Sequence, residues 1–264
     1  MRQIGINLHA KRGLDVDTYA GRVKALGFDT VFTGVAKTEA EQMALAESFA
    51  KHGLIYENLH APFGHINDIW YDCEGGEAMI SELLISVDRC AAAGAPILVV
   101  HLSSGIKAPQ ISDIGRARFT SLVEHAARKG VTIAFENQRK VANIAWAFEN
   151  FESCDNVGFC WDCGHEACFT LGREYMPLFG HKLVCTHIHD NFKEFNGDAH
   201  LIPFDGKIDF NRFAELINKY EYKGPLTLEV IAGNSNLYDD ISVDAYLEKA
   251  AEAIKKLRAM VDGE

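Results

Sequence analysis

The stretch CTHIHDN, residues 185–191, places His187, His189 and Asp190 directly after an apolar run. Imidazoles and carboxylates both bind metal ions, and both can move protons near neutral pH. The same residue types also occur where a strand simply ends in solvent. The stretch alone therefore leaves three alternatives open, which are a metal site, an acid–base pair and a structural strand end.

Metal-capable residues recur at the ends of other short apolar runs. They are His60 in NLHAP, His101 in VVHLSSG, Glu136 in AFENQ, Asp162 and His165 in CWDCGH, and Glu229 in LTLEV. The segment GDAHLIPFDGKIDF adds Asp198 and His200, whose two-residue spacing lets both side chains point the same way in extended backbone. If these groups converge, their carboxylates repel one another unless a cation balances them. The pattern therefore predicts a bound divalent metal ion.

A repeated unit positions these residues. Helical segments that end near glycine are each followed by a short apolar run, and the cycle recurs roughly every thirty residues. Eight apolar runs are strand candidates, and helical composition marks residues 38–52, 77–93, 114–129 and 243–260. Strict alternation of strand and helix indicates a parallel sheet. Eight such units predict an α/β fold, a closed (β/α)8 TIM barrel forming a single domain over residues 1–264, in preference to an open doubly wound sheet.

The barrel explains why separate motifs can form one site. Catalytic side chains in this fold come from the C-terminal ends of the strands, where the connecting loops gather. The metal-capable residues end consecutive predicted strands, so they are expected on one rim.

Charge and hydrophobicity narrow the class of partner. The chain has 264 residues, with 37 acidic against 26 basic residues and a net charge of −11. Such a charge disfavours nucleic acid and anionic membrane surfaces as partners. The N-terminus lacks the apolar core of a signal peptide, and no apolar run is long enough to span a bilayer, so we predict a cytoplasmic protein. A homo-oligomer is compatible with the sequence, which does not fix the oligomeric state.

These motifs carry a family resemblance. LHAPFG, VVHLSSG, FENQ, DCGH, HIHDN, DAHLIPFDGKIDF and LEV, taken in order, resemble the xylose-isomerase-like TIM barrel superfamily of sugar and sugar-phosphate isomerases and epimerases, inosose dehydratases and endonuclease IV. For the ketose 3-epimerases, the resemblance implies one divalent metal bound by Glu136, Asp162, His187 and Glu229, with His165 contacting substrate. For endonuclease IV, which binds three zinc ions, it implies further ligands at His60, His101, His165, Asp198 and His200. His189 matches no ligand and is expected behind the ligands or against substrate.

The expected function is a sugar or sugar-phosphate isomerase or epimerase that depends on a divalent metal and acts on a small molecule. Mn²⁺ or Zn²⁺ is expected, with Mg²⁺ or Co²⁺ as alternatives. The metal would polarise a sugar carbonyl and stabilise an enediolate, while Glu136 and Glu229 remove and return the proton. A keto-sugar or inosose dehydratase and a zinc phosphodiesterase similar to endonuclease IV are the alternatives. The sugar, its phosphorylation and the number of ions stay open.

Overall fold

The computed structural model describes residues 1–171 and 173–263. Within these residues strands and helices alternate along the chain, as predicted. The strands are β1 (Ile4–Asn7), β2 (Thr30–Gly34), β3 (Ile55–His60), β4 (Ile97–His101), β5 (Thr132–Glu136), β6 (Val157–Asp162), β7 (Leu183–His187) and β8 (Leu226–Leu228). Most strand residues are buried, which is typical of parallel strands covered on both faces.

Helices α2, α3, α4 and α9 fall where composition indicated, and five further helices complete the set in the described residues. In chain order, the helices are α1 (Val16–Ala25), α2 (Glu39–Lys51), α3 (Glu74–Ala92), α4 (Asp113–Lys129), α5 (Val141–Asn150), α6 (Cys163–Phe169), α7 (Met176–Phe179), α8 (Phe210–Lys219) and α9 (Val243–Asp262). Short 3-10 turns are η1 (Ile66–Trp70), η2 (Gly180–Lys182), η3 (Ala232–Asn234) and η4 (Asn236–Tyr238). The expected glycine ends α4, because Gly130 adopts a left-handed φ of 71° there.

The strands form one parallel sheet of eight. Their order is β7-β6-β5-β4-β3-β2-β1-β8, which follows the chain except for the placement of β8 beside β1. A parallel bridge between Ile188, just past β7, and Leu228 of β8 joins the two ends of this order. The predicted (β/α)8 TIM barrel is thereby confirmed.

Contacts between Cα atoms divide the chain into two compact units, neither of which is a continuous segment. The first unit consists of Met1–Phe32, Glu47–Tyr56 and Trp161–Glu264. The second unit consists of Thr33–Ala46 and Glu57–Cys160. The single domain expected for residues 1–264 stays a prediction.

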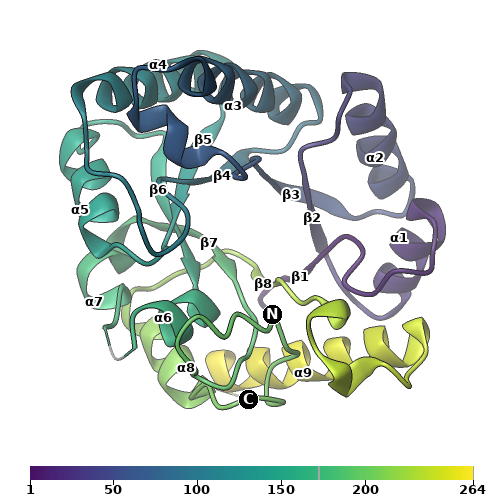
Figure 1. The fold of residues 1–264 in the computed structure, drawn as a ribbon. Coiled ribbons are helices and arrows are strands. Elements are labelled where there is room, and N and C mark those ends of the chain that lie inside the picture. The colour runs from purple at the N-terminus through teal and green to yellow at the C-terminus, as the bar shows by residue number, and fades with distance from the viewer. Residues whose placement is uncertain (172, 264) are drawn as a thin grey trace. The chain divides into compact units, whose positions relative to one another are not determined.

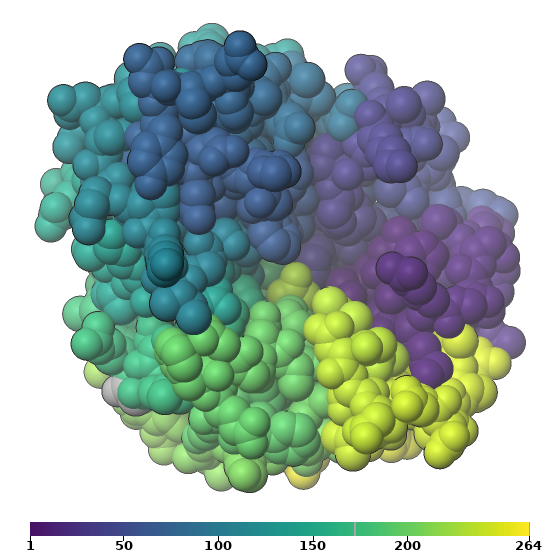
Figure 2. Space-filling model, viewed as in Figure 1, coloured from purple at the N-terminus to yellow at the C-terminus, as the bar shows by residue number. Residues whose placement is uncertain are grey.

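In the first unit, the two ends of the chain pack against each other. β1 pairs with β8, with Ile4 opposite Leu226, and helices α8 and α9 lie side by side (Figure 1). Figure 2 shows the N-terminal residues in purple against the C-terminal residues in yellow. Arg22 of α1 and Asp244 of α9 form an ion pair of 3.3 Å.

In the second unit, β4 pairs along its whole length with β5, and α3 and α4 pack together beside η1 (Figure 1). The Trp70 indole of η1 donates a hydrogen bond to the Leu102 carbonyl, and a Cβ on Gly115 would lie 2.1 Å from the Trp70 ring. Glycine at that position of α4 therefore permits the close packing.

None of the helices in the described part of the chain is both long enough and apolar enough to cross a bilayer.

Candidate metal centre

The strand ends carry the metal-capable residues that the sequence placed there. β3, β4 and β5 end in His60, His101 and Glu136, and β6 and β7 end in Asp162 and His187. Glu229 directly follows β8. His165 lies in the first turns of α6, and His189, Asp198 and His200 lie in the segment between β7 and α8.

In the second unit, His60, His101 and Glu136 form one buried group. The Nε2–H of His101 donates a hydrogen bond to Oε2 of Glu136, and His60 Nε2 lies 3.4 Å from the same oxygen. The Glu136 side chain has no exposed surface. The His60 Nδ1–H donates to the Ala61 carbonyl at 2.8 Å, so Nε2 of the neutral ring faces Glu136.

Two further residues of this group were not assigned a role from the sequence. The Gln138 amide donates to Oε2 of Glu136 at 3.4 Å and lies 3.2 Å from Nε2 of His101. Phe63 stacks on the His101 ring with a centroid separation of 4.4 Å. The only signal for Gln138 was its position two residues past Glu136, which places both on one face of an extended segment.

In the first unit, Asp162, His187 and Glu229 bring their ligand atoms within 4.8 Å of one another. His187 Nδ1 lies 3.3 Å from Oε2 of Glu229, and the His187 ring stacks on Phe32 at 4.6 Å. Two carboxylates and an imidazole are a donor set that divalent ions such as Mn²⁺ and Zn²⁺ accept. The residues therefore fit the predicted metal. Glu136, the fourth expected ligand, lies in the other unit, and its part in this set stays a prediction.

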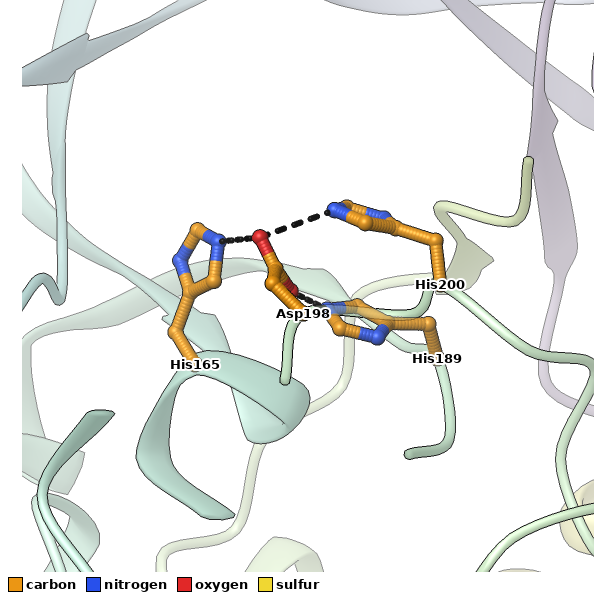
Figure 3. Close-up of side chains that lie close together, drawn as sticks. All are labelled: His165, His189, Asp198 and His200. Atoms are coloured by element: carbon orange, nitrogen blue, oxygen red, sulfur yellow. Dashed lines mark ion pairs between the residues drawn. The ribbon is translucent and has the colours of Figure 1, made fainter. Parts of the chain in front are cut away.

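A second group in the first unit surrounds Asp198 with three histidines (Figure 3). Oδ2 of Asp198 lies 3.4 Å from His165 Nε2 and 3.3 Å from His200 Nε2. Oδ1 of Asp198 lies 3.6 Å from His189 Nε2, which is also 3.1 Å from Oδ1 of Asp162.

The carboxylates and imidazoles of this group shift one another's pKa values. Burial alone would raise the pKa of Asp198, but the neighbouring His165 and His200 hold it well below its ordinary range. Burial alone would lower the pKa of His200, whereas the Asp198 and Glu229 carboxylates raise it to about 9. A site that concentrates opposite charges in this way favours either protonated imidazoles or a bound cation.

The segment that carries Asp198 and His200 is fixed by Asp190. Its side chain is fully buried and accepts hydrogen bonds from four backbone N–H groups at 2.8–3.0 Å, those of Asn191, Phe204, Gly206 and Ile208. Its backbone pairs with Leu201 in an antiparallel bridge. Burial raises the pKa of the Asp190 carboxyl, and the four N–H donors oppose that effect. Only the offset of Asp190 from His187 was visible in the sequence, because its hydrogen-bond partners lie in the loop that follows.

The glycine of the DCGH motif, Gly164, has a steric role that the sequence did not indicate. A Cβ on Gly164 would lie 1.9 Å from Cε1 and 2.3 Å from Nε2 of His189. A Cβ atom essentially never lies this close to an atom to which it is not bonded. Gly164 therefore leaves the space that the His189 ring occupies.

A family model described as xylose isomerase-like TIM barrel matches residues 20–260. The chain belongs to the xylose isomerase-like TIM barrel family. This confirms the family predicted from the sequence. Among curated relatives, the uncharacterized protein y4fM of Sinorhizobium fredii (strain NBRC 101917 / NGR234) is 30% identical over 190 residues. That match covers 66% of the chain and 58% of the relative, so the chain spans less than two thirds of the relative's length.

Solved structures of sugar epimerases share the family's fold. An L-ribulose 3-epimerase is 18% identical with a TM-score of 0.79, covering 100% of this chain and 95% of that one. D-psicose 3-epimerase with D-tagatose from Clostridium cellulolyticum H10 is 13% identical with a TM-score of 0.78, covering 99% of each. The 3-keto-D-glucoside 4-epimerase YcjR from E. coli is 16% identical with a TM-score of 0.75, covering 98% and 100%. At these identities the likeness establishes the fold.

Proposed function

We propose that this chain is a sugar or sugar-phosphate isomerase or epimerase that requires a divalent metal. The observation that carries the proposal is the grouping of Asp162, His187 and Glu229 at the ends of β6, β7 and β8, with ligand atoms within 4.8 Å. Membership of a family whose fold is shared by several sugar epimerases supports it.

In the proposed reaction the metal activates the carbonyl, and glutamate side chains transfer the proton. A divalent ion on these ligands, Mn²⁺ or Zn²⁺ with Mg²⁺ or Co²⁺ as alternatives, would supply a Lewis acid that polarises a sugar carbonyl. Glu136 is proposed as the fourth ligand from the family resemblance. The proposed role of the Glu229 carboxylate, whose side chain is 15% exposed, is to exchange a proton with a bound molecule.

The direction of proton return sets the product. Glu229 and Glu136 are the proposed pair of bases, one removing the proton next to the carbonyl and the other returning it. Return to the opposite face of the same carbon gives an epimer, and return to the neighbouring carbon gives an isomer. His165 is proposed to contact substrate hydroxyls. A cytoplasmic location and a small-molecule sugar partner belong to the same proposal.

The test replaces each proposed base by its near-isosteric amide. The metal-loaded chain is incubated with ketoses and ketose phosphates in D₂O, and solvent deuterium in the sugar is measured by mass spectrometry. We expect E136Q and E229Q each to lose turnover by about 10²–10⁴-fold, because a positioned base contributes about that much. E248Q, at an exposed glutamate of α9, is the matched control and should exchange at the wild-type rate.

Three outcomes would count against the proposal. Full exchange by E136Q or E229Q would remove the two-base mechanism. Loss of water from the sugar mass would identify a keto-sugar or inosose dehydratase instead. If the chain turns over no sugar but cleaves an abasic DNA duplex, it is instead a phosphodiesterase. Residues around Glu136 and Asp198 match the zinc ligands of endonuclease IV.

A further inference from the structure

We infer that His165, His189, Asp198 and His200 form a closed four-ligand Zn²⁺ site, in which His189 is the fourth ligand. Three of these residues match endonuclease IV ligands, whereas His189 matches none. The inference concerns a second site beside Asp162, His187 and Glu229, and it does not depend on the proposed reaction.

The spacing of the ligand atoms suits an ion better than direct hydrogen bonds. Nε2 of His165 and of His200 lie 3.4 and 3.3 Å from Oδ2 of Asp198, and Nε2 of His189 lies 3.6 Å from Oδ1 (Figure 3). Hydrogen bonds from a charged imidazole to a carboxylate are shorter, about 2.7–2.9 Å. A tetrahedral zinc with bonds of about 2.0–2.1 Å spaces its ligand atoms about 3.3–3.4 Å apart.

Nε2 of His189 and Nε2 of His200 face Asp198. His200 Nδ1 lies 2.8 Å from the Glu229 carbonyl, and His189 Nδ1 lies 3.4 Å from the Asp190 carbonyl. Because a carbonyl only accepts, each Nδ1 carries a hydrogen, which leaves Nε2 of each ring as the atom that would bind a metal ion. Between such a nitrogen and a carboxylate there must be either a proton or a metal ion, and the long spacing of these atoms favours the metal.

Two of the atoms that face this space are buried and have no hydrogen-bond partner among the described residues. They are Oδ1 of Asp198 and Nε2 of His189, whose 3.1 Å approach to Oδ1 of Asp162 lacks hydrogen-bond geometry. His189 is fully buried, and Asp198 is only 27% exposed. Buried polar atoms normally have a partner, and a metal ion would serve both of these atoms at once.

The chain holds His189 in place from both sides. Its ring stacks on His200 with a centroid separation of 4.0 Å and an interplanar angle of 16°. On the other side, Gly164 leaves room that any larger residue would fill. The position of His189 is therefore built into the fold.

The fourth ligand changes the chemistry of the site. Zinc sites with four protein ligands are structural, whereas catalytic zinc keeps one position for water or substrate. A zinc held by His165 of α6, His189 past β7, and Asp198 and His200 of the following loop would join these three segments. It would leave no coordination position for a phosphate.

The test measures zinc binding to the full chain after chelator treatment. We expect the wild type to bind two equivalents of Zn²⁺. His189→Asn should weaken one of them by at least about 100-fold, the upper range reported for losing a residue that merely supports a metal ligand. Gly164→Ala retains every ligand and should weaken the same equivalent by displacing the His189 ring. His65→Asn, at a side chain that is 86% exposed, is the matched control and should bind two equivalents.

Ligand identity is read from the zinc X-ray absorption spectrum of the E229Q chain, which lacks one ligand of the neighbouring set. Four nitrogen or oxygen neighbours with scattering from three imidazoles are expected. Wild-type affinity in both His189→Asn and Gly164→Ala, or a spectrum with fewer than three imidazoles, would overturn the inference. Loss of turnover in E229Q with this zinc retained separates the reaction from the site.

Discussion

Asp190 is buried and Asp198 is partly buried, and the two aspartates have different surroundings. Asp198 faces three imidazoles, while Asp190 accepts hydrogen bonds from backbone N–H groups of residues 191–208. We propose that Asp198 binds a cation, whereas Asp190 holds the loop in shape. A substitution at each should therefore change a different measured property.

We expect Asp190→Asn to lower the free energy of unfolding by about 2–4 kcal/mol, because an amide cannot accept from all four N–H donors and places its own hydrogens among them. Urea denaturation of the chelator-treated chain measures this change. Asp72→Asn, at an exposed aspartate, is the control and should stay within about 0.5 kcal/mol of the wild type. If Asp190→Asn were equally neutral, the loop would owe its shape to other contacts.

Helices α6 and α7 are connected through Glu166. Its carboxylate accepts hydrogen bonds from the Tyr175 backbone N–H at 2.7 Å and from the Trp161 indole at 3.2 Å. Burial raises the pKa of Glu166 to about 7, from an ordinary value of 4.5. The folded chain therefore binds this proton more tightly than the unfolded chain does.

This difference has a definite sign. The contribution of Glu166 to stability is fully present below pH 4.5 and is lost as the pH rises through about 7. We expect the wild type to lose up to about 3 kcal/mol relative to Glu166→Gln between those pH values. Urea denaturation of the two chelator-treated proteins, compared at each pH, measures the difference. Parallel stability curves would mean that Glu166 titrates normally.

The elements that could be predicted from the sequence are those specified by local patterns. The strand ends at His60, His101, Glu136, Asp162 and His187 follow from short apolar runs and from the turn that precedes each run. Each run can be recognised as a buried strand from its own apolar residues, without knowledge of its tertiary contacts.

The loop between β7 and α8 could not be predicted in this way. Lys193, Asn196, His200 and Phe204 adopt positive φ values, which non-glycine residues seldom do. Contacts distant in sequence, such as those of Asp190, impose that conformation. The partnership of Gly164 with His189 was missed for the same reason, since two motifs must meet in space before the need for glycine becomes visible.

At the scale of the whole molecule, net charge and site chemistry both bear on the alternative that the chain is a nuclease. A net charge of −11 repels a phosphate backbone, whose binding gains affinity from lysine and arginine contacts. The inferred closed zinc site would also offer no position to a phosphate oxygen. Both arguments disfavour a nuclease, although residues at several positions match endonuclease IV ligands.

We therefore expect the zinc-loaded chain neither to bind nor to cleave a DNA duplex that contains an abasic site. Fluorescence anisotropy at about 0.1 M salt measures binding, and lowering the salt tests whether screening hides an attraction. A duplex of the same sequence without the abasic site is the control. Cleavage at the abasic site that disappears in Glu136→Gln would show that local ligand geometry outweighs the charge of the whole molecule, and it would replace the proposed sugar chemistry.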